Sequence, residues 1–599
     1  MRNLRLPTQS ALLAGLTVAT GAMAMAPRTA EACGGTFCDS GPTSMPVDQS
    51  GENVIFVMEP GFVEAHIQIQ YDPFTEAENF AWVIPVQVLP EFSVGSEPFF
   101  DAVLAATVPR YGFNTTNDVC SDPSDTGDEV SSGGDTSAET SGDGDGDGPS
   151  GPSVVYRDTV GAFDITVLQG GSIEEVMMWL ADNGYQQDPA AMPILGEYLE
   201  EGFLFAAMKL THTAGMNSIH PITLRMATDE ACVPLRLTAI AATEDMDVRT
   251  FFFGDERVIP TNYRHVEVNP LKIDWRRRAI NYKEVVTLAV DADGADGNAF
   301  VTEYAGNDAV VNLNGVYTAA WGYAADGLVN HVDTPVNVMP FLESGRLMEC
   351  FDDWDYEYYY DDPTCYAAHP LMGGLLNRYL PVPEGVAAKY FYGCLSCYEA
   401  QIDLQAWDAA AFEADIRELI VAPGERAAAI VAENPYITRM YTTISDMEMN
   451  EDPIFRPNPD LEPVPSLRIA DRQVHCDGSA HMTLPDGRVV YMPDSNIWPD
   501  IFPDQMPWEE TVQAGTLTGA LMPLVEQTET INQLLTEWNK AGEPEDQLGI
   551  YGACTCSSAD GEGGGAALAS LGFLGLLGLR VRRRRVGNRT ATAGARASA

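Results

Sequence analysis

The stretch FVEAHIQIQY, residues 62–71, decides the fold class, because apolar and polar residues alternate along it from Val63 to Gln70. Its apolar positions fall on one side: Val63, Ala65, Ile67 and Ile69. A period of two is the pattern of a β-strand with one buried face. The apolar stretch NVIFVM (53–58) precedes it and FAWVIPVQVLPEF (80–92) follows it. We therefore expect neighbouring strands here, with the prolines of the last stretch at an edge or a bend.

Helix signals interrupt the strands along the rest of the chain. Ser172 followed by Glu175 forms a capping box, which predicts a helix over IEEVMMWLADNGY (173–185). Further helices are expected at 97–107, 189–202, 406–420 and 524–542. Strands are expected at 203–212, 219–227, 233–242 and 247–259. A hairpin is expected at 481–493, with its turn at Asp486-Gly487. Because strands and helices do not alternate regularly, we expect an α+β fold, with a β-rich N-terminal domain containing inserted helices and a mixed α/β C-terminal region.

The composition divides the chain into segments. The stretch 114–152 is acidic and has almost no apolar residues to bury, which predicts a disordered insertion within a domain. The expected order is a signal peptide at 1–32, an exported domain at 33–280 with that insertion, a mixed C-terminal region at 281–545, a tether and sorting motif at 546–565, and a hydrophobic segment with an Arg-rich tail at 566–599.

The N-terminus has the pattern of an export signal. Two arginines precede a small, apolar stretch at 11–26 that is too short to span a membrane as a helix. Ala30-Glu31-Ala32 then supplies the small-residue pattern that a signal peptidase recognises. Cleavage after Ala32 would make Cys33 the first residue. Lipidation of Cys33 is a second interpretation, although Ala30 and Glu31 depart from the usual lipobox.

The charge balance argues against a nucleic-acid surface. The chain carries 87 Asp+Glu against 34 Lys+Arg, a net charge of −53. A chain this acidic is repelled by phosphate backbones and by anionic lipid headgroups. We therefore expect no nucleic-acid partner, and we expect no cofactor. Calcium binding is expected to be weak at most, because the Asp-rich stretches at 143–147 and 291–298 lack the ligand spacing of an EF-hand loop.

Export would place the 11 cysteines in an oxidising compartment, where disulfides are the default. Proximity in the chain suggests the pairs Cys33–Cys38, Cys350–Cys365 and Cys394–Cys397. Connectivity does not follow from sequence. If Cys554 and Cys556 of the tail serve another purpose, an odd number of cysteines remains, and at least one of them is free or modified.

Two other uses compete with structural pairing. Cys394-Leu-Ser-Cys397 follows an aromatic stretch and precedes helix-like sequence, the order seen in thiol–disulfide oxidoreductases, where a helix N-terminus lowers a thiol's pKa. A zinc site formed by Cys350, Cys365, Cys394 and Cys397 would need reduced thiols, which an oxidising compartment removes.

No motif assigns catalytic residues. The sequence has no H-E-x-x-H, G-x-S-x-G or phosphate-binding loop, and His475 and His481 flank a predicted loop, CDGSA. The acidic aromatic stretch DDWDYEYYYDD (352–362) is the most unusual local composition. It is either a binding surface, since Tyr and Trp are favoured contact residues, or a loop held by a Cys350–Cys365 disulfide.

Five stretches of the first half carry a family resemblance: ACGGTFC (32–38), PVDQSGENVIFVM (46–58), HIQIQYDPFTEAENFAWVIPV (66–86), PEFSVGSEPFFDAVLAATVP (90–109) and HPITLRMATDEACVPLRLTAI (220–240). In this order they resemble an uncharacterised bacterial family, domain of unknown function 2330, over most of residues 32–280. The resemblance implies an exported domain of unknown activity and supplies no catalytic residues.

The stretch 552–585 is similar to the myxobacterial C-terminal sorting tail, MYXO-CTERM. Cys554 and Cys556 precede a small-residue spacer, an apolar segment at 566–579 and an arginine cluster at 580–585. The apolar segment reaches only about 21 Å as a helix, less than the ~30 Å core of a bilayer. The resemblance implies cleavage by a sorting protease near the cysteines and a lipid on one of them. A permanent anchor helix is the alternative.

These features predict a non-enzymatic protein with a binding or structural role, exported and anchored through its C-terminus to the outer surface of a Gram-negative cell. Its partners would be the export machinery, the sorting protease and the membrane, reached through the tail or a lipid. An exported thiol–disulfide oxidoreductase that uses Cys394 and Cys397 is the alternative.

Overall fold

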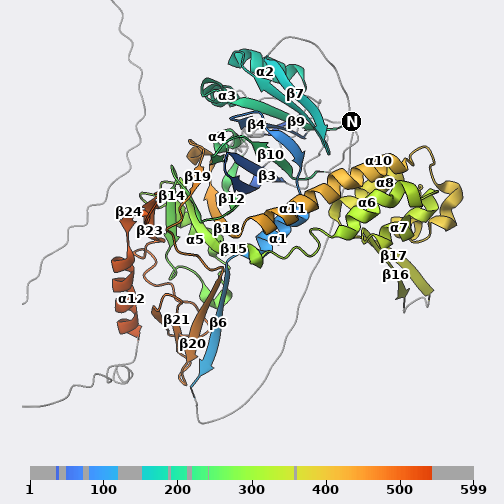
Figure 1. Ribbon diagram of the computed structural model, residues 1–599. Helices are drawn as coiled ribbons and strands as arrows, with labels where there is room; N and C mark the ends of the chain where they lie inside the picture. Colours follow the sequence, from blue (N-terminus) through green and yellow to red (C-terminus); the bar gives the residue numbers. More distant parts are fainter. Residues whose placement is uncertain are drawn as a thin grey trace, which may run out of the picture. The chain divides into compact units, whose positions relative to one another are not determined.

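The computed structural model (Figure 1) describes residues 36–38, 49–71, 80–118, 152–185, 190–211, 219–240, 242–355 and 360–542. The expected signal peptide, sorting motif and tail lie outside the described residues, and so do Ala32, Cys33, Cys554 and Cys556. The described part is an α+β structure, as the sequence predicted. Within it, no helix combines the length and apolar character needed to cross a membrane.

A ten-stranded mixed sheet is the largest element. Its strands, in spatial order, are β24 (Met522–Glu526), β23 (Glu509–Ala514), β14 (Arg264–Val268), β15 (Ala299–Asn307), β18 (Tyr436–Ile444), β12 (Ala242–Gly254), β2 (Gln49–Glu59), β3 (Phe62–Tyr71), β10 (Ile222–Met226) and β5 (Glu91–Val94). Neighbours are antiparallel except for the parallel pairs β12–β2 and β14–β15. Strands from both sides of residue 280, where the sequence suggested a boundary, are hydrogen-bonded to one another in this sheet.

A five-stranded antiparallel sheet packs on one face of the large sheet. Its order is β1 (Thr36–Cys38), β4 (Phe80–Val86), β9 (Leu204–Leu210), β8 (Phe163–Gln169) and β7 (Ser153–Val160). Both sheets contribute to one hydrophobic core, with Val54 and Phe56 from the large sheet and Trp82 and Ile165 from the small one. Helices α2 (Ile173–Asp182) and α3 (Ala191–Glu200) cover the outer face of the small sheet.

The other face of the large sheet is covered by α1 (Glu97–Thr107) and α11 (Ala422–Glu433), through a core that contains Ile55, Val57, Phe99 and Ile430. The layers therefore run helix, sheet, sheet, helix (Figure 1). Strands β2 and β3 are buried on both faces as a result.

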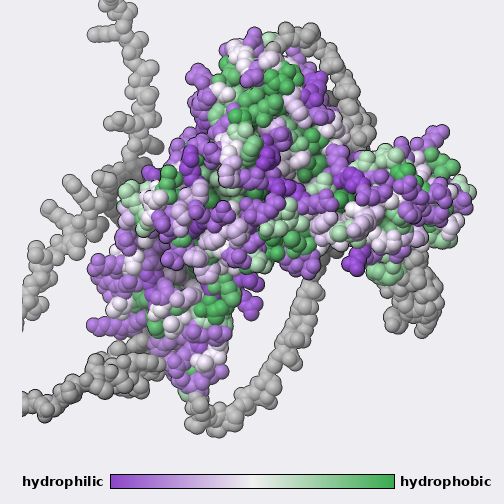
Figure 2. Space-filling model, viewed as in Figure 1, coloured by the Kyte–Doolittle hydropathy of each residue, from purple (hydrophilic) through white to green (hydrophobic). Residues whose placement is uncertain are grey.

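The remaining elements extend this centre. A four-stranded sheet contains β22 (Val489–Met492), β21 (Ala480–Thr483), β20 (Leu467–Val474) and β6 (Arg110–Asn117). A three-stranded sheet contains β11 (Ala231–Cys232), β19 (Ile454–Pro457) and β13 (Val258–Pro260). A two-stranded sheet contains β16 (Met348–Asp355) and β17 (Tyr360–Ala367). The other helices are α4 (Leu235–Thr238), α5 (Tyr282–Val290), α6 (Ala319–His331), α7 (Val338–Ser344), α8 (Pro370–Tyr379), α9 (Ala388–Gly393), α10 (Ala409–Ile416) and α12 (Thr528–Gly542). Hydrophilic residues occupy much of the visible surface, with smaller hydrophobic patches among them (Figure 2).

Several local predictions are confirmed. Helix α1 has the expected bounds, and α2 has the expected capping box, in which the Ser172 hydroxyl accepts from the Glu175 backbone N–H and the Glu175 carboxylate accepts from the Ser172 N–H. The hairpin β21–β22 turns at Gly487, whose φ is 88°. Each of these signals depends on residues close together in the chain.

Other local predictions are wrong. Within the expected strand 233–242, Leu235–Thr238 form the short helix α4 instead, and Leu235 and Leu237 belong to two different core clusters, which explains the strand-like spacing of the pattern. The expected helix at 524–542 begins at Thr528, because Met522–Glu526 pair with β23. The expected disordered insertion begins at 114, whereas β6 continues to Asn117 because β20 supplies a parallel partner. The stretch 119–151 lies outside the described residues.

A cavity of about 10 Å³, room for one water molecule, lies between the two sheets. Its lining comes from β2, β3, β4 and the α4 segment: Glu52, Ile67, Trp82, Val83, Ile84, Pro85, Pro234, Leu237 and Thr238. Glu52 is 4% exposed, and its Oε2 has no hydrogen-bond partner. Burial raises the pKa of the Glu52 carboxyl to about 7, so this carboxyl is neutral in mildly acidic solution.

Glu52 should make the protein less stable as pH rises. Between about pH 4.5 and pH 7 the unfolded chain loses a proton that the folded chain keeps, so the free energy of unfolding falls across this window, by a total on the order of 3 kcal/mol. In Glu52→Gln this contribution is absent. Calorimetric melting temperatures from pH 4.5 to pH 8 should therefore fall less steeply for Glu52→Gln than for the native chain or for the exposed-site control Glu200→Gln. Parallel curves for all three proteins would contradict the prediction.

Candidate functional site

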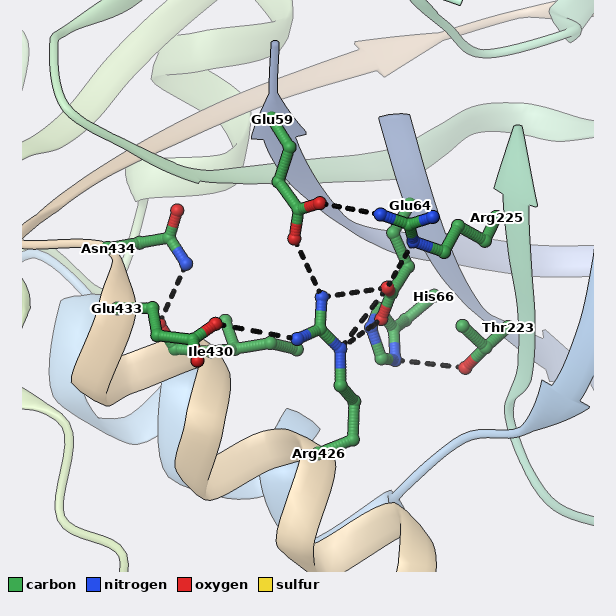
Figure 3. Close-up of polar contacts among 9 residues, drawn as sticks. All are labelled: Glu59, Glu64, His66, Thr223, Arg225, Arg426, Ile430, Glu433 and Asn434. Carbon is green, nitrogen blue, oxygen red and sulfur yellow. Dashed lines mark hydrogen bonds and ion pairs between the residues drawn. The ribbon is translucent and has the colours of Figure 1, made fainter. Parts of the chain in front are cut away.

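Strand β3 carries polar side chains that lie inside the protein. Glu64 and His66 are only 5% and 4% exposed, and they lie on the face of the large sheet toward α11 (Figure 3). The antiparallel register with β10 places Arg225 opposite Glu64 and Thr223 opposite His66. We refer to five side chains as the charged cluster: Glu59, Glu64, His66, Arg225 and Arg426.

Arg426 of helix α11 is the centre of the charged cluster. Its Nε donates to Glu64 Oε1 at 2.9 Å, and its Nη2 donates to Glu64 Oε2 at 2.8 Å and to Glu59 Oε1 at 3.1 Å. The two parallel bonds to Glu64 use the planar fork of the guanidinium, which is the strongest geometry for a carboxylate pair. One side chain of α11 thus holds residues of both β2 and β3.

Arg225 balances the remaining charge. Its Nη2 donates to Glu59 Oε2 at 2.7 Å, and its Nε lies 3.8 Å from Glu64 Oε2. Two carboxylates therefore face two guanidiniums, and opposite charges sit on directly paired positions of β3 and β10. Glu433 lies farther out, 3.8 Å from Arg426 Nη1.

His66 is hydrogen-bonded at both ring nitrogens. Its Nε2 lies 2.8 Å from Glu64 Oε1, and its Nδ1 lies 3.0 Å from the Thr223 hydroxyl. Because an ionised carboxylate only accepts, Nε2 carries the proton that is donated to Glu64, and Nδ1 can accept from Thr223. The Phe99 ring of α1 meets the imidazole edge-on, with the centroids 6.2 Å apart.

Helix α11 approaches the sheet after a π-helical turn, Arg417–Val421. Pro423 in its first turn has no N–H to complete an α-helical hydrogen bond, which favours a wider turn at this point. Gly424 allows a close approach, because a Cβ there would lie 2.9 Å from the Val316 carbonyl oxygen. These residues set the position from which Arg426 meets β3.

The electrostatics of Glu64 limit its chemistry. Burial acts to raise the pKa of the carboxyl, but the hydrogen bonds from His66 and Arg426 and the positive charge of Arg426 outweigh burial and lower the pKa to about 2. Glu64 is therefore ionised at neutral pH and already accepts from both partners, so it is a poor general base. The described residues also include no group of three or more His, Cys, Asp or Glu side chains that would hold a metal ion. The arrangement suits a clamp between sheet and helix better than a catalytic centre.

Two of the expected cysteine pairs are present as disulfides. Cys350–Cys365 joins the strands of the β16–β17 hairpin, and Cys394–Cys397 closes a short loop at the start of a 3₁₀ helix, Leu395–Gln401. As disulfides these four sulfurs do not offer a zinc site. The pairing Cys33–Cys38 includes a residue outside the described part of the chain.

Two further cysteines have defined states. Cys476 is disulfide-bonded, and Cys232 is free and partly buried, beside the backbone of β19. Burial raises the pKa of the Cys232 thiol well above its usual value, with a further contribution from the Asp452 carboxylate, so this thiol is a poor nucleophile.

The C-x-x-C lies in a helical part of the chain. Cys394 follows α9 and is half-buried, whereas Cys397 is exposed. The loop is not preceded by a strand, so it lacks the β-strand context of the thioredoxin-like motif.

A family model described as an uncharacterized protein conserved in bacteria, DUF2330, matches residues 27–326, about half of the chain. The chain belongs to the DUF2330 family. The DUF2330 match includes Glu59, Glu64, His66 and Arg225 but ends within α6, so Arg426 comes from outside the matched part. Neither the curated proteins nor the solved structures contain a match to this chain. The DUF2330 model thus identifies a lineage without an activity.

The alternation in FVEAHIQIQY does not predict the charged cluster, because an alternating strand normally turns its polar side to solvent. A signal was present in the preceding strand, where Val54, Ile55, Phe56 and Val57 are consecutive and apolar. A strand that is apolar on both faces indicates a sheet covered on both faces, and β3 of this DUF2330 protein is its direct neighbour.

Removing Arg426 should be costly because it leaves Glu64 buried and without its main counter-charge. Arg426→Ala is expected to lower the free energy of unfolding by about 3–5 kcal/mol. Arg417→Ala is the matched control on the same helical segment, since Arg417 pairs with Asp326 at the surface and such pairs contribute less than about 1 kcal/mol. Melting temperatures and hydrogen exchange of α11 measure both effects.

A second variant separates the ion pair from simple packing. Adding Glu64→Gln to Arg426→Ala removes the unpaired carboxylate, so the double variant should be more stable than Arg426→Ala alone. Equal melting temperatures for Arg426→Ala and Arg417→Ala would show that the cluster does not hold α11 in place.

Proposed function

We propose that this DUF2330 protein is exported and anchored at the outer cell surface through its C-terminus, where it has a binding or structural role. The N-terminal pattern that ends at Ala32 supports export, and the similarity of residues 552–585 to a sorting tail supports anchoring. Both segments lie outside the described residues, so support from the fold comes from other features.

The observation that carries the proposal is the set of disulfides. Cys350–Cys365, Cys394–Cys397 and the disulfide-bonded Cys476 lie in separate parts of the chain. Such disulfides persist in oxidising compartments and are rare in the cytosol. Cys350–Cys365 joins the strands of a hairpin and Cys394–Cys397 closes a short loop, and cross-links of this kind benefit a protein outside the cell.

The charged cluster supports a role without catalysis. Its ionised groups neutralise one another, and Glu64 has no capacity left to accept a proton at neutral pH. By contrast, the β16–β17 hairpin offers a contact surface. Phe351 and Tyr366 are 51% and 56% exposed, and their rings stack at 5.4 Å between centroids. The Cys350–Cys365 bridge holds this aromatic pair at low conformational cost, as contact residues require.

Surface display can be tested on intact cells that express the full chain. Brief protease treatment should release peptides from the folded body. Mass spectrometry of the mature protein should then show Cys33 at its N-terminus and a C-terminus at or near Cys554 or Cys556, with or without a lipid. Replacing both tail cysteines by serine should keep the protein cell-associated but unprocessed. A protein that resists protease until the cells are lysed would contradict surface display.

The competing oxidoreductase function predicts a different property of the C-x-x-C. A structural disulfide stays oxidised to potentials below about −300 mV, whereas a catalytic pair is reduced at less negative potentials. Thiol trapping of the purified protein in graded redox buffers should find both Cys394–Cys397 and Cys350–Cys365 oxidised down to this range. A Cys394–Cys397 pair that titrates well above Cys350–Cys365 would favour the oxidoreductase.

A further inference from the structure

A second group of polar side chains lies at one end of the four-stranded sheet, away from the charged cluster. His475 follows the last residue of β20, and His481 lies on the next strand, β21. His475 Nε2 and His481 Nδ1 are 2.6 Å apart, and the two rings meet at 77°. His475 is 8% exposed and His481 is partly exposed, so solvent reaches the pair from the His481 side.

Asp118 orients His475 from the opposite side. Its Oδ2 accepts from His475 Nδ1 at 2.8 Å, while its Oδ1 accepts from Gln473 Nε2 at 3.0 Å. The parallel register of β6 and β20 brings these groups together, because Asn117 pairs with Val474 and the Asp118 N–H donates to the Val474 carbonyl. The carboxylate is thereby fixed at both oxygens.

This contact decides which nitrogen of His475 is basic. A carboxylate that accepts at Nδ1 places the ring proton there, so Nε2 presents its lone pair to His481. A histidine whose second nitrogen donates to a carboxylate is the usual arrangement of a metal ligand, since the carboxylate fixes the tautomer and raises the basicity of the ring. Here the lone pair is aimed at another imidazole nitrogen instead of solvent.

We propose that His475 Nε2 and His481 Nδ1 bind a divalent transition-metal ion, such as Zn²⁺ or Cu²⁺, with Asp118 as a positioning residue. Imidazole nitrogens suit these borderline ions, whereas Ca²⁺ and Mg²⁺ take oxygen ligands. Two bonds of about 2.0–2.1 Å at a tetrahedral angle need nitrogens about 3.3 Å apart. The two nitrogens are now 2.6 Å apart, so the two rings have to separate by roughly 0.7 Å for an ion to enter between them.

The ion takes the place of the proton that joins the two rings. His481 Nδ1 donates to His475 Nε2 in the metal-free pair, so binding requires this proton to move to His481 Nε2 through water, with no net release. The described residues supply these two ligands, and water completes the coordination on the exposed side of His481. The turn between the strands is held by hydrogen bonds from the His475 N–H to the Ser479 carbonyl and from the Gly478 N–H to the His475 carbonyl. The backbone of the site is thus preorganised.

The test uses the full chain without an affinity tag and with its disulfides intact. In isothermal titration calorimetry with ZnCl₂, the native chain should bind one ion more tightly than the background of its acidic surface. His475→Ala and His481→Ala should each weaken this binding at least tenfold, and Asp118→Asn should weaken it about 10–100-fold. His331→Ala, an exposed histidine on α6, is the matched control and should bind as the native chain does. CaCl₂ should show the background alone in every protein.

Electron paramagnetic resonance with one equivalent of CuCl₂ identifies the ligands directly. The native chain and Asp118→Asn should show hyperfine coupling to two imidazole nitrogens, and His481→Ala should show one fewer. Melting temperatures establish that each variant folds. If His481→Ala does not fold, the copper spectra of the native chain and of Asp118→Asn still show whether two imidazole nitrogens bind the ion. Zinc binding that is unchanged in both histidine variants, or a copper spectrum with oxygen ligands only, would overturn the proposal and leave a hydrogen-bonded pair.

Discussion

The ion pair between Glu64 and Arg426 joins residues 362 positions apart, and it connects the large sheet to the helix layer that covers one of its faces. Glu64 belongs to a strand whose other side chains form the core between two sheets, and Arg426 belongs to the helix that covers the opposite face. Neither group tolerates burial alone, because an unpaired charge in the interior costs several kcal/mol. The strand face and the helix therefore have to be in place together.

The same constraint specifies the register of the large sheet. Shifting β3 by one residue would turn Glu64 and His66 into the core between the sheets and bring Ala65 and Ile67 under α11. A sheet that is apolar on both faces has little else to prevent such a slip. In the observed register Arg225 lies opposite Glu64 and Thr223 lies opposite His66, so both buried polar side chains of β3 find a partner. The cluster thus contributes specificity as well as attachment.

Local signals account for most of what could be predicted from the sequence. Helix α1, the Ser172 capping box and the turn at Gly487 each depend on a few adjacent residues, and each is where the sequence placed it. Prediction failed where a residue far away in the sequence determines the local structure. Leu235 and Leu237 have strand-like spacing because they serve two different cores, and Asn114–Asn117 are ordered because β20 lies beside them. The charged cluster and the Asp118–His475–His481 group were missed for the same reason.

The sequence by itself determined the α+β class, the family and the buried apolar side of β3, and it suggested the pairs Cys350–Cys365 and Cys394–Cys397, because periodicity, caps and chain proximity act over a few residues. Tertiary structure alone decided that β12, from one half of the chain, pairs with β18, from the other, and that the polar side of β3 is buried under α11. It also decided that His475 faces His481 with Asp118 behind it. These contacts join residues far apart in the chain, and only the packing of whole sheets and helices brings them within bonding distance.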